Sequence, residues 1–272
     1  MNNTVVRAIS GSVYVILIVF LVLYNSYTVS FLFLALMVFG LLELNKIMKA
    51  IGGVYTTTLY VLSILLFFLF AADLLIPEFP LLQFISVFIV ILFTALILFL
   101  FKEDREPSVE RIGNTLLSVI YLSVPISLAL QLVKISNSFV LLSVFIFLWS
   151  NDTFAFVVGK SIGRKKLFES ISPKKTVEGF IGGLVGAILA AVIISYYHVE
   201  YSALFWIVIA VVVSISGTFG DLFESLLKRK AGIKDSGHIM PGHGGVLDRI
   251  DSFLFSIPFC FSFVVIFKYL IL

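Results

Sequence analysis

The stretch LLQFISVFIVILFTALILFLF, residues 81–101, carries no charge, and its only polar side chains are Gln, Ser and Thr. A helix needs about 20 apolar residues to cross a bilayer, where its backbone groups must be hydrogen-bonded internally. This stretch therefore predicts a membrane-spanning helix. The same criterion predicts an all-α, polytopic integral membrane protein with about nine transmembrane helices. The predicted spans are residues 8–24, 29–44, 53–72, 80–101, 114–133, 138–159, 179–197, 202–224 and 250–271.

Composition supports this fold class. Of the 272 residues, 60% are hydrophobic and only 13% are charged, whereas soluble domains are about a quarter charged. The single cysteine, Cys260, lies in an apolar run, which excludes a disulfide framework and a cysteine metal site. The first span has no small-residue cleavage site after it, so we interpret it as a helix and not as a signal peptide.

Basic residues give a test of the topology that does not depend on hydropathy. If nine spans alternate, 17 of the 19 Lys and Arg residues lie on the side that holds the N-terminus, and only Lys134 and Lys268 lie on the other. The positive-inside rule then places the N-terminus in the cytoplasm and the C-terminus outside. We expect a protein of the cytoplasmic membrane with its active site on the cytoplasmic face.

The two halves of the chain differ in polar content. Residues 1–113 are predicted to be scaffold helices, with almost no polar residue in the spans beyond Ser, Thr and Gln. Residues 114–272 contain three polar clusters, at 149–179, 214–230 and 231–252. Ionisable groups at or within membrane helices are costly and indicate function. We therefore assign the catalytic site to the second half.

The last two polar clusters have the components of a polyphosphate–metal site. In a helix, Asp221, Glu224 or Ser225, and Lys228 share one face by their spacing. The glycine-rich stretch PGHGG (241–245) precedes the last span, near whose start lies Asp248. Backbone N–H groups at such a turn can receive phosphate oxygens, and carboxylates nearby can hold Mg²⁺.

The first polar cluster supplies further charges. Asp152 falls inside an apolar span, where an uncompensated carboxylate is expensive. Ser172 followed by Pro173 is typical of a helix N-cap and first turn, which predicts that Lys174 and Lys175 begin a helix. For the basic residues at 164–166, attraction to anionic lipid headgroups is an equally good interpretation.

Two segments carry a resemblance to a known family. SLLKRKAGIKDSGHIMPGHGGVLDRID (225–251) is similar to the signature of the phosphatidate cytidylyltransferases, and NDTFAFVVGKSIGRKKLFESISPKKTVEG (151–179) resembles that family's second recurrent block. Together they cover about a fifth of the chain. The resemblance implies that CTP and phosphatidate give CDP-diacylglycerol and pyrophosphate. It also implies Mg²⁺, with Mn²⁺ as an alternative, a second cation such as K⁺, and a homodimer in contact with membrane lipid and without nucleic acid.

The resemblance also implies roles for individual residues. Phosphatidate is largely a dianion at neutral pH and needs no general base, so His243 is expected to orient a phosphate oxygen. The residues expected to act in catalysis are Asp152, Lys174, Lys175, His243 and Asp251. The expected metal ligands are Asp221 and Asp248, supported by Asp251 or Asp152. The expected CTP phosphate ligands are Lys174, Lys175, Gly244 and Gly245, and those for the lipid phosphate are Lys228 and Arg229.

Other functions use similar components. A CTP-dependent polyprenol kinase, or a cytidylyltransferase for another lipid phosphate, would differ only in its acceptor pocket. A CDP-alcohol phosphotransferase lacks support because its DG-x2-AR motif is absent from the sequence. A transporter using Asp152, Asp221 and Asp251 would place polar residues near the bilayer midplane in both halves of the chain. Clustering at one face favours an enzyme, and a purely structural role explains least.

Overall fold

The computed structural model describes residues 3–100, 109–237, 239 and 244–271, with backbone alone at 3–9, 96–100 and 269–271. Helices dominate these residues, and the only strands among them form one short hairpin. The helices are α1 (Asn3–Tyr24), α2 (Ser26–Ile51), α3 (Thr56–Leu75), α4 (Leu81–Leu100), α5 (Val109–Ser118), η1 (Val119–Ser123), α6 (Val124–Ile135), α7 (Ser138–Ile162), α8 (Val177–Tyr197), α9 (Ala203–Lys230) and α10 (Leu247–Ile271). The strands are β1 (Lys166–Phe168) and β2 (Ser172–Thr176).

The predicted all-α membrane fold is confirmed. Each predicted span overlaps a helix, and α5, η1 and α6 form one continuous span, Val109–Ile135, that contains a π-helical turn. Within the described residues, seven helices are long and apolar enough to cross a membrane. The first and fourth predicted spans contribute shorter apolar stretches, Ser10–Tyr24 and Leu81–Ala95, so the total of nine stays a prediction.

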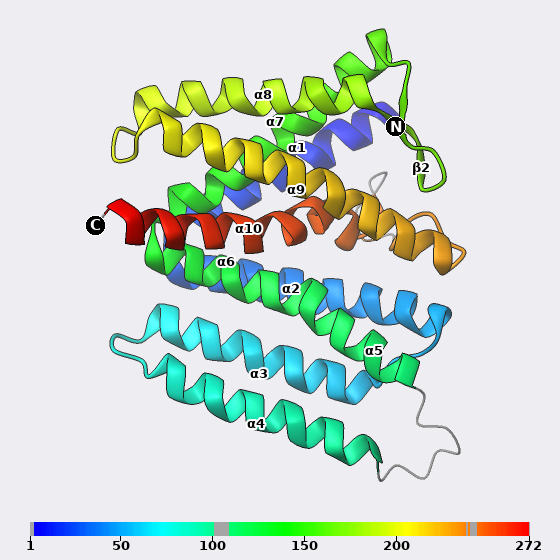
Figure 1. Cartoon of the computed structure of the whole chain (residues 1–272), viewed down its shortest axis with the longest axis vertical. Coiled ribbons are helices and arrows are strands. Elements are labelled where there is room, and N and C mark those ends of the chain that lie inside the picture. The colour runs from blue at the N-terminus through cyan, green and yellow to red at the C-terminus, as the bar shows by residue number, and fades with distance from the viewer. Residues whose placement is uncertain (1–2, 101–108, 238, 240–243, 272) are drawn as a thin grey trace.

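The connections alternate between the two ends of the helix bundle (Figure 1). The β hairpin, the α2–α3 connection and the end of α9 lie at one end, where α1 also begins. The α3–α4 and α8–α9 connections lie at the other end, where α10 finishes. The loops that carry most of the basic residues are therefore gathered at a single end of the molecule.

The predicted helix start at Ser172–Pro173 is wrong. Ser172–Thr176 is strand β2, which pairs antiparallel with β1, and α8 begins only at Val177. Thr176 caps this helix, because its hydroxyl accepts a hydrogen bond from the Gly179 N–H at 3.1 Å. Lys174 and Lys175 therefore lie on a strand and not in a first helical turn.

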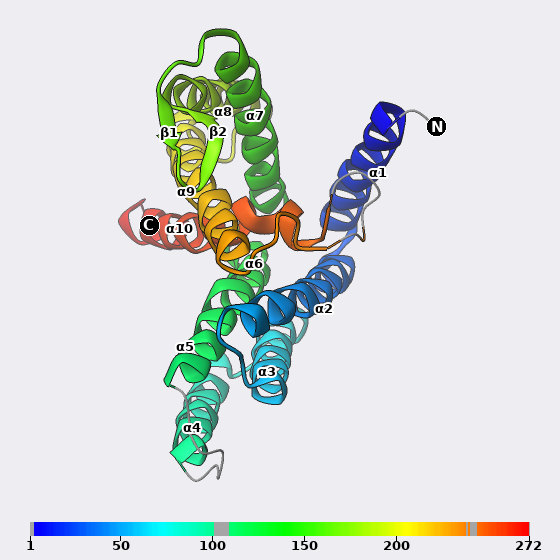
Figure 2. The same cartoon turned by 90° about the vertical axis from the view of Figure 1, so that its right-hand side faces the viewer.

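Small residues allow α7 and α8 to approach closely. A Cβ added at Gly183 would lie 2.6 Å from Asn151 Oδ1, and one at Gly186 would lie 2.4 Å from the Phe154 side chain. In lipid, close helix packing depends on such small residues because water gives no driving force there. Figure 2 shows α7, α8 and the hairpin side by side. The glycines thus keep the Asn151–Phe154 part of α7 against α8.

The first half of the chain contains two buried carboxylates, one within the second predicted span and one just after the third. Glu43 in α2 and Asp73 in α3 are each only 2% exposed. Asp73 lies 2.6 Å from the Lys134 ammonium and accepts a hydrogen bond from the Gln131 amide at 2.8 Å. Glu43 contacts the segment before α10, as described below. A buried carboxylate must be paired or hydrogen-bonded, and both of these are.

Candidate active site

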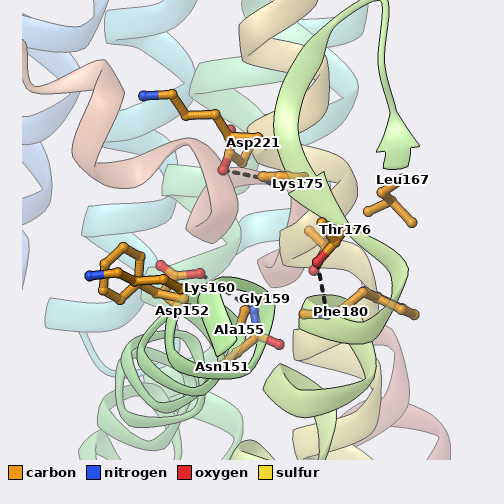
Figure 3. A pocket seen from close by; sticks show the side chains of 14 residues that line it. Asn151, Asp152, Ala155, Gly159, Lys160, Leu167, Lys175, Thr176, Phe180 and Asp221 are labelled. Carbon is orange, nitrogen blue, oxygen red and sulfur yellow. Dashed lines mark hydrogen bonds and ion pairs between the residues drawn. The ribbon is translucent and has the colours of Figure 1, made fainter. Parts of the chain in front are cut away.

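A cavity of about 470 Å³ opens where α7, α8 and α9 meet the β hairpin (Figure 3). The hairpin contributes Lys174, Lys175 and Thr176, and α9 contributes Asp221. Asn151 and Asp152 reach the cavity from α7, which brings the predicted first and second polar clusters together. Its lining residues are Asn151, Asp152, Ala155, Phe156, Gly159, Lys160, Leu167, Lys174, Lys175, Thr176, Gly179, Phe180, Thr218 and Asp221.

One ion pair crosses this cavity. The Lys175 ammonium lies 2.6 Å from Asp221 Oδ2, and both side chains are partly exposed, at 26% and 35%. The other Asp221 oxygen accepts a hydrogen bond from the Ser225 hydroxyl at 3.3 Å. The pair therefore joins a basic strand to an acidic helix at a position that solvent can reach.

The hairpin that carries Lys175 is held by backbone contacts. The Glu178 carboxylate accepts hydrogen bonds from the Arg164 N–H at 3.0 Å and from the Lys165 N–H at 3.2 Å. The Lys166 ammonium donates to the Pro173 carbonyl at 2.7 Å. These contacts fix the strands relative to the start of α8, and so fix the two lysines at the cavity.

A second ionic group lies at the end of α9. The Lys228 ammonium lies 2.5 Å from Glu224 Oε2 and 2.6 Å from Asp248 Oδ1, and its side chain is 12% exposed. Glu224 is fully buried, and its Oε1 has no hydrogen-bond partner. Lys228 therefore pairs with Glu224 within α9 and links α9 to α10 through Asp248.

Asp248 is fixed at the start of α10. Its Oδ2 accepts hydrogen bonds from the N–H groups of Gly245, at 2.8 Å, and Ser236, at 2.9 Å. Asp248 also lines a small cavity of about 90 Å³ with Asp152 and Asp251. Because Asp152 lines both cavities, these carboxylates belong to one polar region.

The residues present fit a magnesium ion. Glu224 Oε1 and Asn151 Oδ1 are buried oxygens without a hydrogen-bond partner. The carboxylates of Asp152, Asp221 and Asp248 are hard oxygen donors, which Mg²⁺ prefers. No three His, Cys, Asp or Glu side chains in the described ranges are grouped to hold a metal by themselves. Mg²⁺ needs only one or two carboxylates, because waters and substrate phosphates complete its shell.

Several predicted ligands lie apart from the cavity or outside the described residues. Arg229 is exposed, and its guanidinium donates to the Ile233 carbonyl at 3.4 Å. Gly244 adopts a left-handed φ of +87°, and the Gly245 N–H is bonded to Asp248. His243 lies outside the described residues. The phosphate-binding roles of these residues stay predictions.

Sequence reasoning missed Glu43, which lies in the half of the chain taken as scaffold. Its carboxylate contacts Ser236, Val246 and Leu247, around the start of α10. The signal was present, because an acidic residue within a predicted span is a functional indication by default. Asp152 and Glu43 both satisfy this rule.

Comparisons with known proteins place the chain in a family. The model of the cytidylyltransferase family matches residues 5–267. A phosphatidate cytidylyltransferase of Bacillus subtilis (strain 168) is 48% identical over 124 residues, 44% of this chain and 45% of the relative. One of Staphylococcus haemolyticus is 44% identical over 120 residues, 43% of this chain and 46% of the relative.

One of Staphylococcus aureus (strain COL) is 47% identical over 120 residues, again 43% of this chain and 46% of the relative. The matched part thus spans less than half the length of these curated relatives. The family model, in contrast, covers nearly all of the chain. The protein therefore belongs to the cytidylyltransferase family.

Proposed function

We propose that this protein transfers the cytidylyl group of CTP to phosphatidate, giving CDP-diacylglycerol and pyrophosphate. The observation that carries the proposal is the Lys175–Asp221 contact in the 470 Å³ cavity. It supports the proposal because an ammonium suited to phosphate and a carboxylate suited to a metal ion lie side by side in a member of the cytidylyltransferase family. We propose phosphatidate as the acceptor because the bacterial relatives are phosphatidate cytidylyltransferases.

The reaction asks for positioning and charge compensation. A phosphate oxygen of phosphatidate forms a bond to the α-phosphorus of CTP, and the bond from that phosphorus to the bridging oxygen breaks as pyrophosphate leaves. The lipid phosphate has its second pKa at about 6 and already carries the nucleophilic charge at neutral pH. The protein must hold two anions together and stabilise the in-line displacement. Lys174 and Lys175 would neutralise the CTP phosphates.

The metal dependence is part of the proposal. Asp221 and Asp248 would hold Mg²⁺ or Mn²⁺, with Asp152 or Asp251 in support. When bound, the ion would offset negative charge on the phosphates, in addition to the charge that the lysine ammonium groups offset. A second cation such as K⁺ stays a prediction.

We place the lipid phosphate at the end of α9. Arg229 is exposed there and has donors available for a phosphate, in fork geometry. Lys228 is already matched by two carboxylates, so we expect it to contribute less positive charge to the lipid phosphate than Arg229 does.

The enzyme is proposed to lie in the cytoplasmic membrane with the N-terminus and the cavity on the cytoplasmic side. Basic loops gather at the end of the bundle that holds the cavity, and the positive-inside rule assigns that end to the cytoplasm. CTP is then available to the site from the aqueous phase. The homodimer stays a prediction.

The test uses purified protein, phosphatidate, Mg²⁺ and CTP labelled in two ways. Label in the cytosine ring should enter a lipid-soluble product, while label in the γ-phosphate should leave as pyrophosphate. Transfer of γ-label to a polyprenol would identify the kinase alternative. If ring label enters the lipid product only when another lipid phosphate is supplied, that lipid phosphate and not phosphatidate is the acceptor.

A further inference from the structure

Glu43 joins the first half of the chain to the segment that carries Asp248. It lies in α2, is 2% exposed, and accepts three hydrogen bonds. The donors are the Ser236 hydroxyl at 2.7 Å, the Val246 N–H at 3.0 Å and the Leu247 N–H at 2.8 Å. Since α10 begins at Leu247, two of these donors are N–H groups at a helix start, which an anion stabilises.

Glycines leave room for this carboxylate. A Cβ added at Gly237 would lie 2.3 Å from Glu43 Oε1, and one at Gly245 would lie 2.4 Å from Oε2. Any other residue at these positions would displace the Glu43 side chain or the backbone. Gly245, predicted to bind a CTP phosphate, thus lies against a protein carboxylate.

Ser236 connects Glu43 to Asp248. Its hydroxyl lies 2.7 Å from Glu43 Oε2 and 3.0 Å from Asp248 Oδ2. A hydroxyl has a single proton, and Asp248 Oδ2 already accepts from the N–H groups of Ser236 and Gly245. The shorter contact to Glu43 is thus the better placed for the Ser236 proton. Both carboxylates therefore contact Ser236 and the backbone around the start of α10.

We infer that Glu43 is a positioning residue for the transfer reaction, acting through Ser236 and the start of α10 on Asp248. Glu43 lines neither the large nor the small cavity, so it has no direct access to substrate there. Asp248 lines the small cavity and binds Lys228. Loss of Glu43 should therefore disturb the placement of Asp248 and lower kcat, with little effect on the KM for CTP. This role in catalysis rests on the proposed function.

Two variants separate positioning from general stability. Glu43→Gln keeps the side-chain length but offers one acceptor oxygen, while Val246 and Leu247 donate to different oxygens. One buried N–H then faces an amide NH₂ and loses its partner. Asp73→Asn is the matched control, because Asp73 is equally buried and joins a different pair of helices, α3 and α6, through its ion pair with Lys134.

The experiment measures steady-state kinetics, thermal stability and amide hydrogen exchange on full-length protein. We expect Glu43→Gln to lower kcat by about 10-fold or more, with the KM for CTP within about 3-fold of wild type. The amides of Val246 and Leu247 should exchange faster. Asp73→Asn should lose comparable thermal stability and change neither kcat nor the exchange of these amides.

Ser236→Ala supplies a double-mutant cycle. If Glu43 acts through Ser236, the double variant should be little worse than Glu43→Gln alone, whereas independent effects would multiply. Wild-type kcat and exchange in Glu43→Gln would overturn the inference, and so would an equal loss of kcat in Asp73→Asn. If the wild type is inactive but the amides of Val246 and Leu247 exchange as expected, the proposed reaction is wrong. The hydrogen bonds from Glu43 to the start of α10 would still be supported.

Discussion

At the scale of single residues, the Lys175–Asp221 ion pair can be replaced by contacts with substrate and metal ion. Both side chains are partly exposed, and exposed ion pairs contribute only about 0–1 kcal/mol. The contact can therefore open at little cost when a phosphate takes the ammonium and a cation takes the carboxylate. The Lys228–Glu224–Asp248 group is more buried, which suits a more permanent part of the site.

The carboxylates proposed as metal ligands should be sensitive to loss of charge. Asp221→Asn and Asp248→Asn keep the size of the side chain but remove the charge. We expect each to lower activity by orders of magnitude while the protein still inserts and purifies. Rates measured across a Mg²⁺ series provide the check, with Glu169→Gln, an exposed residue of the hairpin turn, as control. Near-normal turnover with unchanged Mg²⁺ dependence would remove that residue from the set of ligands.

The basic residues should divide between the two substrates. Lys175→Ala should raise the KM for CTP or lower kcat, because Lys175 lines the cavity. Arg229→Ala should chiefly weaken the dependence on lipid phosphate, because a guanidinium offers bidentate contact that Ala cannot. Kinetics with each substrate varied in turn measure both. Similar, modest and salt-sensitive effects on both substrates would mean that these residues only attract anionic lipid.

At the scale of elements, the sequence predicted the helices well and the hairpin poorly. A spanning helix is a local property, because about 20 apolar residues suffice whatever surrounds them. Strand β2 depends on its partner β1, and Ser172–Pro173 is compatible with an extended strand as well as with a helix start. Sequence periodicity in so short a polar segment could not decide between the two.

The glycine contacts between α7 and α8 give a test at this scale. In Gly183→Ala, the new methyl group would lie 2.6 Å from Asn151 Oδ1 and 2.8 Å from the Asn151 backbone carbonyl. Backbone cannot yield cheaply, so we expect a loss of about 1–3 kcal/mol and lower activity. Thermal unfolding and turnover measure the two effects.

Gly113→Ala is the matched control for this substitution. Gly113 also lies in a helix, and an added Cβ would meet nothing within 4 Å. Alanine is favoured over glycine inside a helix by about 0.5–1 kcal/mol, so this variant should be neutral or slightly stabilised. Equal behaviour of the two variants would mean that the α7–α8 approach does not depend on Gly183.

At the scale of the whole molecule, the site joins segments that sequence patterns treat separately. Asp152, Asp221 and Asp248 come from clusters that the sequence had marked, and two cavities bring them together. Glu43 contacts residues 193 to 204 positions later, and no local pattern encodes such a pairing. Polar residues in apolar surroundings thus predicted several residues that line the two cavities, while their contacts with distant residues could be identified only from the fold.

The whole molecule also shows how the two lysines at the other end of the bundle are bound. Only Lys134 and Lys268 were predicted on the side away from the basic loops, and both have internal partners. Lys134 pairs with Asp73, and Lys268 donates to the Ile135 carbonyl at the end of α6. A cation at a helix C-terminus is favourable. These two lysines are therefore held by the protein, which leaves the loop charges at the other end to set the orientation.

The orientation gives the last prediction. Seventeen basic residues are assigned to the side of the N-terminus, so we expect the N-terminus inside and the C-terminus outside. A reporter fused after Leu272 should behave as external, and one inserted in the α8–α9 connection (198–202) should agree with it. One inserted in the hairpin turn (169–171) should behave as cytoplasmic. The structure puts the hairpin and the end of α10 at opposite ends of the bundle, so their reporters must disagree (Figure 1). A cytoplasmic C-terminal reporter with an external hairpin reporter would mean an inverted molecule. Two cytoplasmic reporters would mean an even number of spans and would contradict the arrangement of the bundle.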